Sequence, residues 1–470
     1  MVVKRAPYIN YNELDSNPLL TGDGAEIPIF IGTSGNSVDS VSRDNITYCR
    51  NIEDVENAIG TSGNLYSNLE KFCEETQLRL LNGETDTAVP YFYVFDLGSN
   101  NTIADYKKAL KESKVKREAT TIVFTDTAQV SNTDLKWDEF SETENNETVT
   151  KYKLTNYSEI AFSPLYYNTL TTQEKAIVDN ALSGIKLTSA EKTTFMAKFD
   201  AEAKNKLITF ANIVKNELKE EAKQALLRIA YFGLPTQTES ETEFYQFIQR
   251  IEDITTSINY PRIGFIELVH TDDLGLTVAR ICSTPYYIEP GYAKYYSVET
   301  TQYRYFKERT PEERDALFNA GLIFNEYDYT LEEITPRICL AVSSAWGVKQ
   351  NVTDGIYDSA DYGKRVNDAL LHARRNVDEQ IRKLFKVIAP QLKRNETSVN
   401  LLQLQTELNI CLEEEKDNGR IQEYEVDIEE ITMNPYCLKI SGRIVPVNAT
   451  LAIEFENYVG APYAIATDYI

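Results

Sequence analysis

Residues 27–32 read Ile-Pro-Ile-Phe-Ile-Gly, a short apolar run that ends at a glycine and is typical of a buried strand. Further helices and strands are predicted to follow in the order 52–59 (helix), 65–81 (helix), 91–95 (strand), 103–113 (helix) and 121–124 (strand). Because strands that alternate with helices form a partly parallel sheet covered by helices, this part of the chain predicts an α/β layer.

After the last of these strands the sequence becomes polar and acidic, and a helical block follows. Thr188 and Glu191 have the spacing of a capping box, which marks the start of a helix. Apolar residues keep helical spacing from Leu207 to Ile229. We therefore expect 127–258 to pack as an inserted, mainly helical domain.

The α/β pattern resumes at 262–269, where Arg-Ile-Gly-Phe-Ile-Glu-Leu-Val predicts another buried strand. Thr310, Pro311 and Glu313 mark the start of a helix, because they can supply its cap, its first residue and a reciprocal cap acceptor. Residues 338–342 predict a short buried strand. The α/β core is therefore expected to be discontinuous, in a fold of the α/β (α+β) class.

The last 110 residues predict two helices and a strand-rich end. One helix places seven apolar residues on a single side, at spacings of four and three: Val366, Leu370, Ala373, Val377, Ile381, Leu384 and Ile388. A second helix has apolar positions at Leu401, Leu404, Leu408 and Cys411 and is expected to end at 417–419. Apolar and acidic residues then alternate strictly over 423–429. The expected domains are an arm (1–25), core (26–126), insertion (127–258), core (259–350), C-terminal domain (351–457) and arm (458–470).

The other side of the first of these helices is basic. From 364 to 394 nine Lys or Arg residues accompany three acidic ones, so this stretch has a formal charge of +6 in a chain whose net charge is −24. Such a helix can present its charge to an acidic partner. A solvated helix face with scattered ion pairs fits the same pattern, and both interpretations remain open.

The composition limits the classes of protein. With 470 residues, 42% of them hydrophobic, the chain can bury substantial cores. A net charge of −24 argues against nucleic-acid binding, since phosphates would be repelled over most of the surface. The six cysteines form no CxxC pair, so free thiols are expected. The N-terminus lacks an apolar signal region and no run approaches 18 apolar residues, so neither secretion nor membrane insertion is expected.

Signals for catalysis are weak. The only histidines, His270 and His372, lie far apart in the sequence, and a structural role at the end of a strand suits His270 better than metal binding. The segment Gly32-Thr33-Ser34-Gly35 lacks the lysine of a phosphate-binding loop. No pair of carboxylates is marked out as acid and base. We therefore predict no catalytic residues, no metal and no cofactor.

The order of these elements resembles the contractile tail sheath subunits of contractile-tailed bacteriophages and related phage-like particles. The resemblance covers roughly 25–126 and 260–460. It is carried by IPIFIG (27–32), TVARI (277–281) with Pro285, Pro290 and Tyr292, ALFNAGLI (316–323), RRNV (374–377), GRI through VD (419–427) and SGRIVPVNA (441–449).

The resemblance implies a multidomain sheath fold and a structural role. Such subunits stack as hexameric rings around a tail tube and contract to drive the tube through a target cell envelope. Extended arms, here 6–14 and 458–470, would add strands to sheets of neighbouring copies. The implied arm residues are Pro7, Tyr8, Ile9, Tyr11, Tyr458, Val459, Tyr463 and Ile465, and the implied tube-contact residues are Arg374, Arg375, Arg382, Lys383 and Lys386.

The implied partners are further copies of the chain, the tail tube protein, and baseplate and tail terminator proteins, with no nucleic acid and no membrane insertion. The implied location is the tail of a virion or phage-like particle, assembled in the host cytoplasm. Two alternatives remain open. One is another self-assembling protein, such as a capsid or surface-layer subunit, and the other is a carboxylate-dependent hydrolase with 127–258 as a lid.

Overall fold

The computed structural model describes eleven stretches of the chain, apart from isolated positions within them: 26–81, 89–126, 135–144, 147–202, 206–235, 241–290, 310–328, 337–342, 371–391, 398–430 and 438–447. Both predicted arms, with all eight arm residues named above, lie outside these residues. The start of the predicted basic helix, 364–370, also lies outside them.

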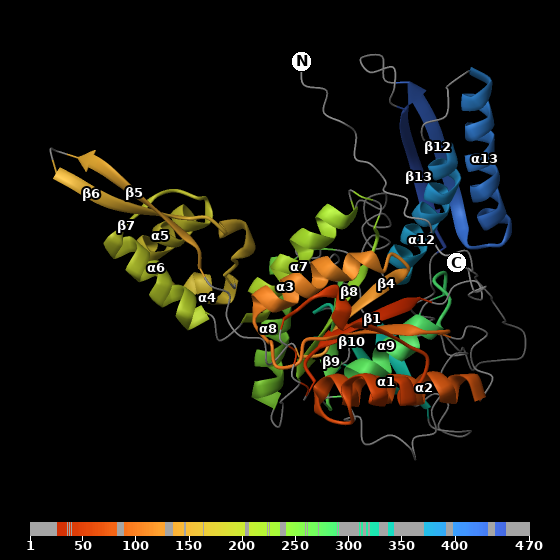
Figure 1. Cartoon of the computed structure of the whole chain (residues 1–470), viewed down its shortest axis with the longest axis horizontal. Coiled ribbons are helices and arrows are strands. Elements are labelled where there is room, and N and C mark those ends of the chain that lie inside the picture. Colours follow the sequence, from red (N-terminus) through yellow and green to blue (C-terminus); the bar gives the residue numbers. More distant parts are fainter. Residues whose placement is uncertain are drawn as a thin grey trace, which may run out of the picture.

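A mixed eight-stranded sheet forms the centre of the molecule (Figure 1). Its order is β11-β10-β9-β8-β4-β1-β3-β2, and the six strands from β10 to β3 run parallel, while β11 and β2 pair antiparallel at the edges. The strands are β1 (Ile27–Gly32), β2 (Ile46–Cys49), β3 (Phe92–Asp96), β4 (Ala119–Phe124), β8 (Ile229–Pro235), β9 (Ile263–Leu268), β10 (Leu322–Asp328) and β11 (Arg337–Val342). The predicted α/β class is confirmed.

Helices cover both faces of this sheet. One face lies under α1 (Ile52–Ile59), α2 (Gly63–Leu81) and α9 (Asp273–Ser283), and the other lies under α3 (Ile103–Glu112), α7 (Lys206–Ala222) and α8 (Glu241–Ile258). Each strand contributes side chains to both faces of the sheet. Phe30 packs on the face covered by α1, α2 and α9, while its neighbours Ile29 and Ile31 pack on the face covered by α3, α7 and α8. Each such fully buried side chain contributes about 1.5–3 kcal/mol to folding.

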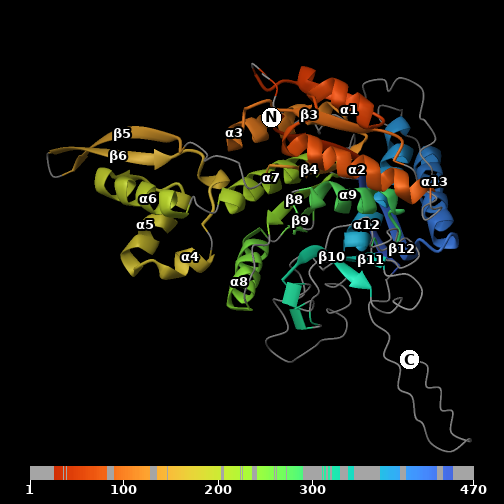
Figure 2. The same cartoon turned by 90° about the horizontal axis from the view of Figure 1, so that it is seen from below.

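A smaller unit, 135–202, projects from the core (Figures 1 and 2). It consists of β5 (Trp137–Glu144), β6 (Glu147–Leu154), β7 (Leu187–Thr188), α4 (Pro164–Thr169), α5 (Thr172–Leu182) and α6 (Ser189–Glu202). It has its own hydrophobic core around Phe162, Val178 and Phe195. The predicted capping box is present, since Thr188 and Glu191 each accept a hydrogen bond from the other's backbone N–H.

The predicted insertion, 127–258, extends too far along the chain. Helix α7 ends at Ala222, and Ile229 begins β8, which lies between β4 and β9 in the central sheet. The helical spacing of apolar residues therefore continues past the end of α7 into a strand. A parallel strand buried on both faces is apolar throughout, so its residues also match a helical template.

The C-terminal unit consists of α12 (Leu371–Ile388), α13 (Ser398–Asp417), β12 (Ile421–Glu430) and β13 (Leu438–Pro446). The two strands form an antiparallel ribbon, and both helices pack with it around Leu404, Leu408 and Val426. Gly419, with φ 67°, follows α13 in the left-handed region that favours glycine. Short 3-10 helices complete the described elements: Arg43–Asn45, Ser113–Val115, Tyr157–Glu159 and Ala389–Gln391.

Candidate interface of the C-terminal unit

Helix α12 joins the C-terminal unit to the core. Its first half is buried, and this half contains polar as well as apolar residues: Leu371, His372, Ala373, Arg375, Asn376, Asp378 and Gln380. Its second half contributes Leu384 and Ile388 to the small core of the C-terminal unit. One continuous helix therefore packs against both the central core and the core of the C-terminal unit, and most of its charged side chains lie between these two parts of the molecule.

Arg375 is only 1% exposed. Its Nε donates to Glu26 Oε1 at 2.8 Å, and its Nη2 donates to the carbonyl oxygens of Ile281 at 3.0 Å and Thr284 at 2.6 Å. The guanidinium thereby donates to carbonyls at the C-terminal end of α9, where the Ile281 carbonyl also accepts the backbone N–H of Thr284. Because the side chain is enclosed by its own chain, the prediction that Arg375 contacts a tail tube is wrong.

Asp378, fully buried, lies between two arginines. Arg262 donates to its two oxygens at 2.7 and 2.8 Å, and Arg374 lies 2.8 Å from Oδ1. Burial acts to raise the pKa of Asp378, but the arginines outweigh it and hold the pKa below its usual value. Arg374 is thus engaged within the chain, although its side chain keeps 18% exposure.

Glu415 of α13 gathers four donors. Lys383 Nζ lies 2.6 Å from Oε1 and Arg420 Nη1 lies 3.0 Å from it, while the Tyr286 hydroxyl donates to Oε2 at 2.9 Å and the Gln380 amide at 2.7 Å. Burial acts to raise the pKa of Glu415, but Lys383 and the other donors hold it below its usual value. This cluster ties α12, α13 and the segment after α9 together.

The two remaining predicted tube-contact residues differ. Arg382 is paired with Glu379 at 2.6 Å and donates to the Leu227 carbonyl at 2.8 Å. Lys386 is exposed and forms no ion pair with the described residues. Of the five predicted residues, Lys386 therefore has the most accessible charge.

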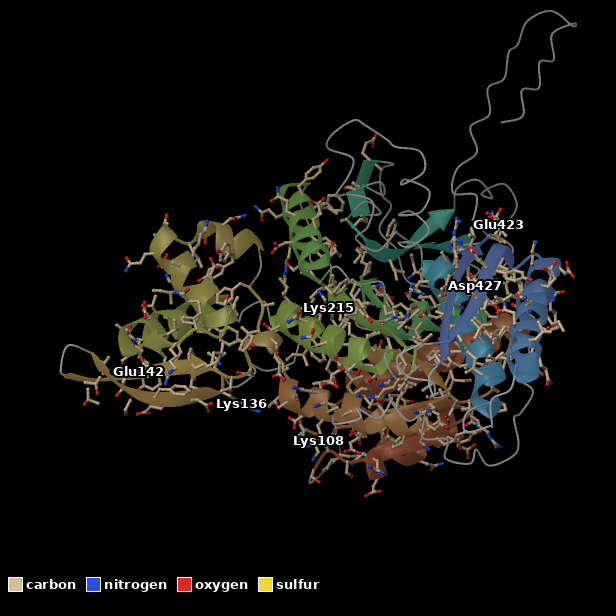
Figure 3. The ribbon with its side chains drawn as sticks, turned by 90° about the horizontal axis from the view of Figure 1, so that it is seen from above. Lys108, Lys136, Glu142, Lys215, Glu423 and Asp427 are labelled. Atoms are coloured by element: carbon tan, nitrogen blue, oxygen red, sulfur yellow. The ribbon has the colours of Figure 1, made fainter. Side chains whose placement is uncertain are left out.

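The outer surface of the C-terminal unit is acidic instead. Glu423 and Asp427 are exposed on β12 (Figure 3). Glu425 is exposed on the same strand, where it lies opposite Arg443 of β13. Glu414 and Asp417 are exposed on α13. The alternation on β12 predicted its acidic face. No local signal revealed the pairing of Arg375, because Glu26 lies 349 residues before it.

The β12–β13 ribbon has no further partner among the strands that the structure describes. Among the described strands, β12 and β13 pair only with one another. Each strand therefore keeps one edge of backbone N–H and C=O groups that could pair with an added strand.

The described residues offer little for catalysis or metal binding. Within them, no group of three or more His, Cys, Asp or Glu side chains could hold a metal ion. The Asp273 carboxylate accepts the backbone N–H of His270 at the start of α9. Buried Glu75 is paired with Arg280, and buried Glu221 with Arg228. Among the described helices, none has the length and apolar character needed to cross a membrane.

Comparison with known proteins shows the fold. No family model and no curated protein matches the sequence. A chain of the 6-fold symmetrised anti-feeding prophage baseplate matches at a TM-score of 0.53 and 9% identity, covering 96% of this chain and 98% of that one. A chain of the contracted anti-feeding prophage helical sheath matches at 0.51 and 10%, with the same coverage. The chain therefore has a contractile-tail-sheath-like fold, as the resemblance in its sequence predicted.

Proposed function

We propose that this chain is a structural subunit of a contractile tail sheath. In this proposal it polymerises as stacked hexameric rings around a tail tube and contracts to drive the tube through a target envelope. The observation that carries the proposal is the end-to-end likeness to a chain of a helical sheath, since 96% of this chain and 98% of that chain align.

The terminal arms, 6–14 and 458–470, would link the subunits. The open edges of β12 and β13 are suitable acceptors, because an added strand would satisfy their unpaired backbone groups. Links made of main-chain hydrogen bonds can persist while the subunits move relative to one another. The arms would thus hold the sheath together as it shortens.

The tube contact would be made by the C-terminal unit. Lys386 is the best candidate, and Arg374, Arg382 and Lys383 would contribute if they exchange internal partners for the tube. Each solvated ion pair is worth about 1 kcal/mol or less. Many weak contacts repeated along the tube would hold the extended state and still allow release. Baseplate and terminator proteins would bind the two ends of the sheath, in the tail of a phage or phage-like particle.

Two other classes of protein are less well supported. A capsid or surface-layer subunit would share the acidic surface but would form shells or flat sheets. A carboxylate-dependent hydrolase would need a close pair of buried carboxylates in a cleft. Among the described residues, five buried acids are paired with a cation: Glu26, Glu75, Glu221, Asp378 and Glu415. Three further buried acids accept hydrogen bonds from neutral groups: Asp96 from Ser34, Asp126 from Thr33 and Tyr106, and Asp273 from the backbone N–H of His270. We therefore propose a role that involves no catalysis.

Deletion of residues 1–14 tests the proposal. The full chain should form long tubes visible by electron microscopy, and the truncated chain should remain a folded monomer, since the core begins at residue 26. Sedimentation measures polymer, and circular dichroism checks folding. Deletion of 1–5 alone is the control, because it leaves the proposed arm intact. Long tubes formed by the chain that lacks 1–14 would contradict the role of the arm.

A further inference from the structure

Helix α13 carries an exposed apolar face. Leu404, Leu408 and Leu412 point into the core of the C-terminal unit, whereas Leu402 and Ile410 are 70% and 61% exposed. Leu402 and Ile410 lie eight residues apart and so share the opposite side of the helix. Two strongly exposed aliphatic residues on one helix face are typical of an interaction surface.

This face ends in unpaired negative charge. Glu414 and Asp417 follow Ile410 by four and seven residues, so they continue the same side of the helix. Both are exposed, and neither forms an ion pair with the residues that the structure describes. A partner that fits this face must offer an apolar contact followed by two cations.

A matching face lies on α3 and the 3-10 turn that follows it. Val115 is 48% exposed, and Lys111 and Lys108 precede it by four and seven residues. Lys108 is exposed and has no ion pair within the described part of the chain. Lys111 lies 3.3 Å from Glu217 but keeps 51% exposure. In a chain of net charge −24, this local excess of cations beside an apolar residue is unusual.

The two faces match in spacing as well as in charge. The order Ile410, Glu414, Asp417 runs forward along α13, while the order Val115, Lys111, Lys108 runs backward along α3. Two antiparallel helices would therefore place Val115 on Ile410, Lys111 beside Glu414 and Lys108 beside Asp417. Opposite charges in this register favour the contact and set its direction.

The two faces cannot meet within one molecule. Helix α3 covers one face of the central sheet, and α13 lies at the far end of the molecule; Figures 1 and 3 show α13 far from α3 and from Lys108. We propose that the α13 face of one copy binds the α3 face of a second copy, in a head-to-tail contact. Such a contact uses two different surfaces, and it repeats to give rings or helices. This inference rests on the proposed function, since it requires copies of the chain to assemble.

Cysteine cross-linking tests the register. Full-length Lys108→Cys and Asp417→Cys chains, mixed and mildly oxidised, should give a disulfide-linked dimer that neither chain alone gives to the same extent. Lys108→Cys mixed with Leu402→Cys is the control, because residue 402 lies about 22 Å along α13 from residue 417. Equal cross-linking to both positions, or to neither, would overturn the proposed register.

Charge exchange tests the energetics in purified full-length chain, where no tail tube is present. Glu414→Lys with Asp417→Lys, or Lys108→Glu with Lys111→Glu, should each raise the critical concentration for polymerisation about tenfold, which corresponds to about 1.4 kcal/mol. The variant that combines all four substitutions restores opposite charges across the contact, so its critical concentration should return most of the way to that of the unmodified chain. Asp138→Lys with Glu139→Lys, on exposed residues of β5, is the control for the first variant, because it makes the same change of net charge, and it should not raise the critical concentration.

These outcomes separate the two proposals. If the unmodified chain forms no tubes, the proposed function fails, and the cross-linking experiment still decides the contact. If tubes form but the variant with all four substitutions polymerises no more readily than either double variant, the proposed contact is wrong while the proposed function stands. A defect that appears only when tube protein is added would assign the α13 face to the tube and would also overturn the inference.

Discussion

Replacement of Arg375 by methionine separates a buried structural residue from one that contacts a partner. Methionine keeps the length and apolar stem of the side chain but removes the guanidinium. It would remove the 2.8 Å partner of the Glu26 carboxylate and the guanidinium hydrogen bonds to the carbonyls of Ile281 and Thr284. Breaking a buried ion pair from one side costs about 3–5 kcal/mol. Since domains are stable by only about 5–15 kcal/mol, much of the stability would be lost.

Urea unfolding of full-length Arg375→Met measures this loss, followed by circular dichroism. Lys386→Met is the matched control, because the side chain is exposed and its replacement should change the unfolding free energy by less than about 0.5 kcal/mol. Adding Glu26→Gln to Arg375→Met should recover part of the loss, since it removes the unpaired charge. An Arg375→Met chain with an unchanged unfolding midpoint and weakened binding to tube protein would refute the reasoning and restore Arg375 as a contact residue.

Two further predictions concern α9. Gly275→Ala should lower the unfolding free energy, measured in urea, by about 3 kcal/mol, because an added Cβ would lie 1.8 Å from the Asn68 carbonyl oxygen of α2. Gly60→Ala is the control: its added Cβ meets no atom within 4 Å, so it tests backbone strain alone. A smaller loss at Gly275 than at Gly60 would count against this packing. Burial raises the pKa of Asp273 to about 6 from 3.8, so its contribution to stability is greatest below pH 3.8 and is lost as the pH rises through 6. Asp273→Asn should therefore be more stable than the unmodified chain by about 1–3 kcal/mol at pH 7, with the difference vanishing toward pH 4, and parallel pH profiles would contradict this assignment.

The layers of the fold could be predicted because they depend on local patterns. The run 27–32 is β1, the capping pair Thr188 and Glu191 begins α6, and the alternation on β12 places its acidic residues outward. Each of these signals lies within a few residues of the element that it specifies. The position of β8 could not be predicted in this way, because only its neighbours β4 and β9 distinguish a buried strand from a buried helix.

The candidate site was predicted less well, and for a physical reason. The basic character of α12 is visible in the sequence, but whether a cation meets solvent or a carboxylate depends on residues far away in the chain. Arg262, Glu415 and Glu26 reach α12 from three other segments and engage its charged side chains. An excess of charge on one helix therefore indicates an acidic partner without telling whether that partner is another molecule or the same chain.

Net charge separates a specific contact from general repulsion. Copies of a chain with net charge −24 repel one another, so any change that makes the chain less negative should favour polymerisation if charge acts only through the total. Glu414→Lys with Asp417→Lys and Asp138→Lys with Glu139→Lys make the same change to this total. A contact between α13 and α3 requires opposite results, with the first pair weakening assembly and the second pair favouring it. Salt should reinforce the distinction. A screening length of about 10 Å at 0.1 M weakens the general repulsion between copies in both variants, and only the variant at Glu414 and Asp417 then still places like charges at the contact between α13 and α3.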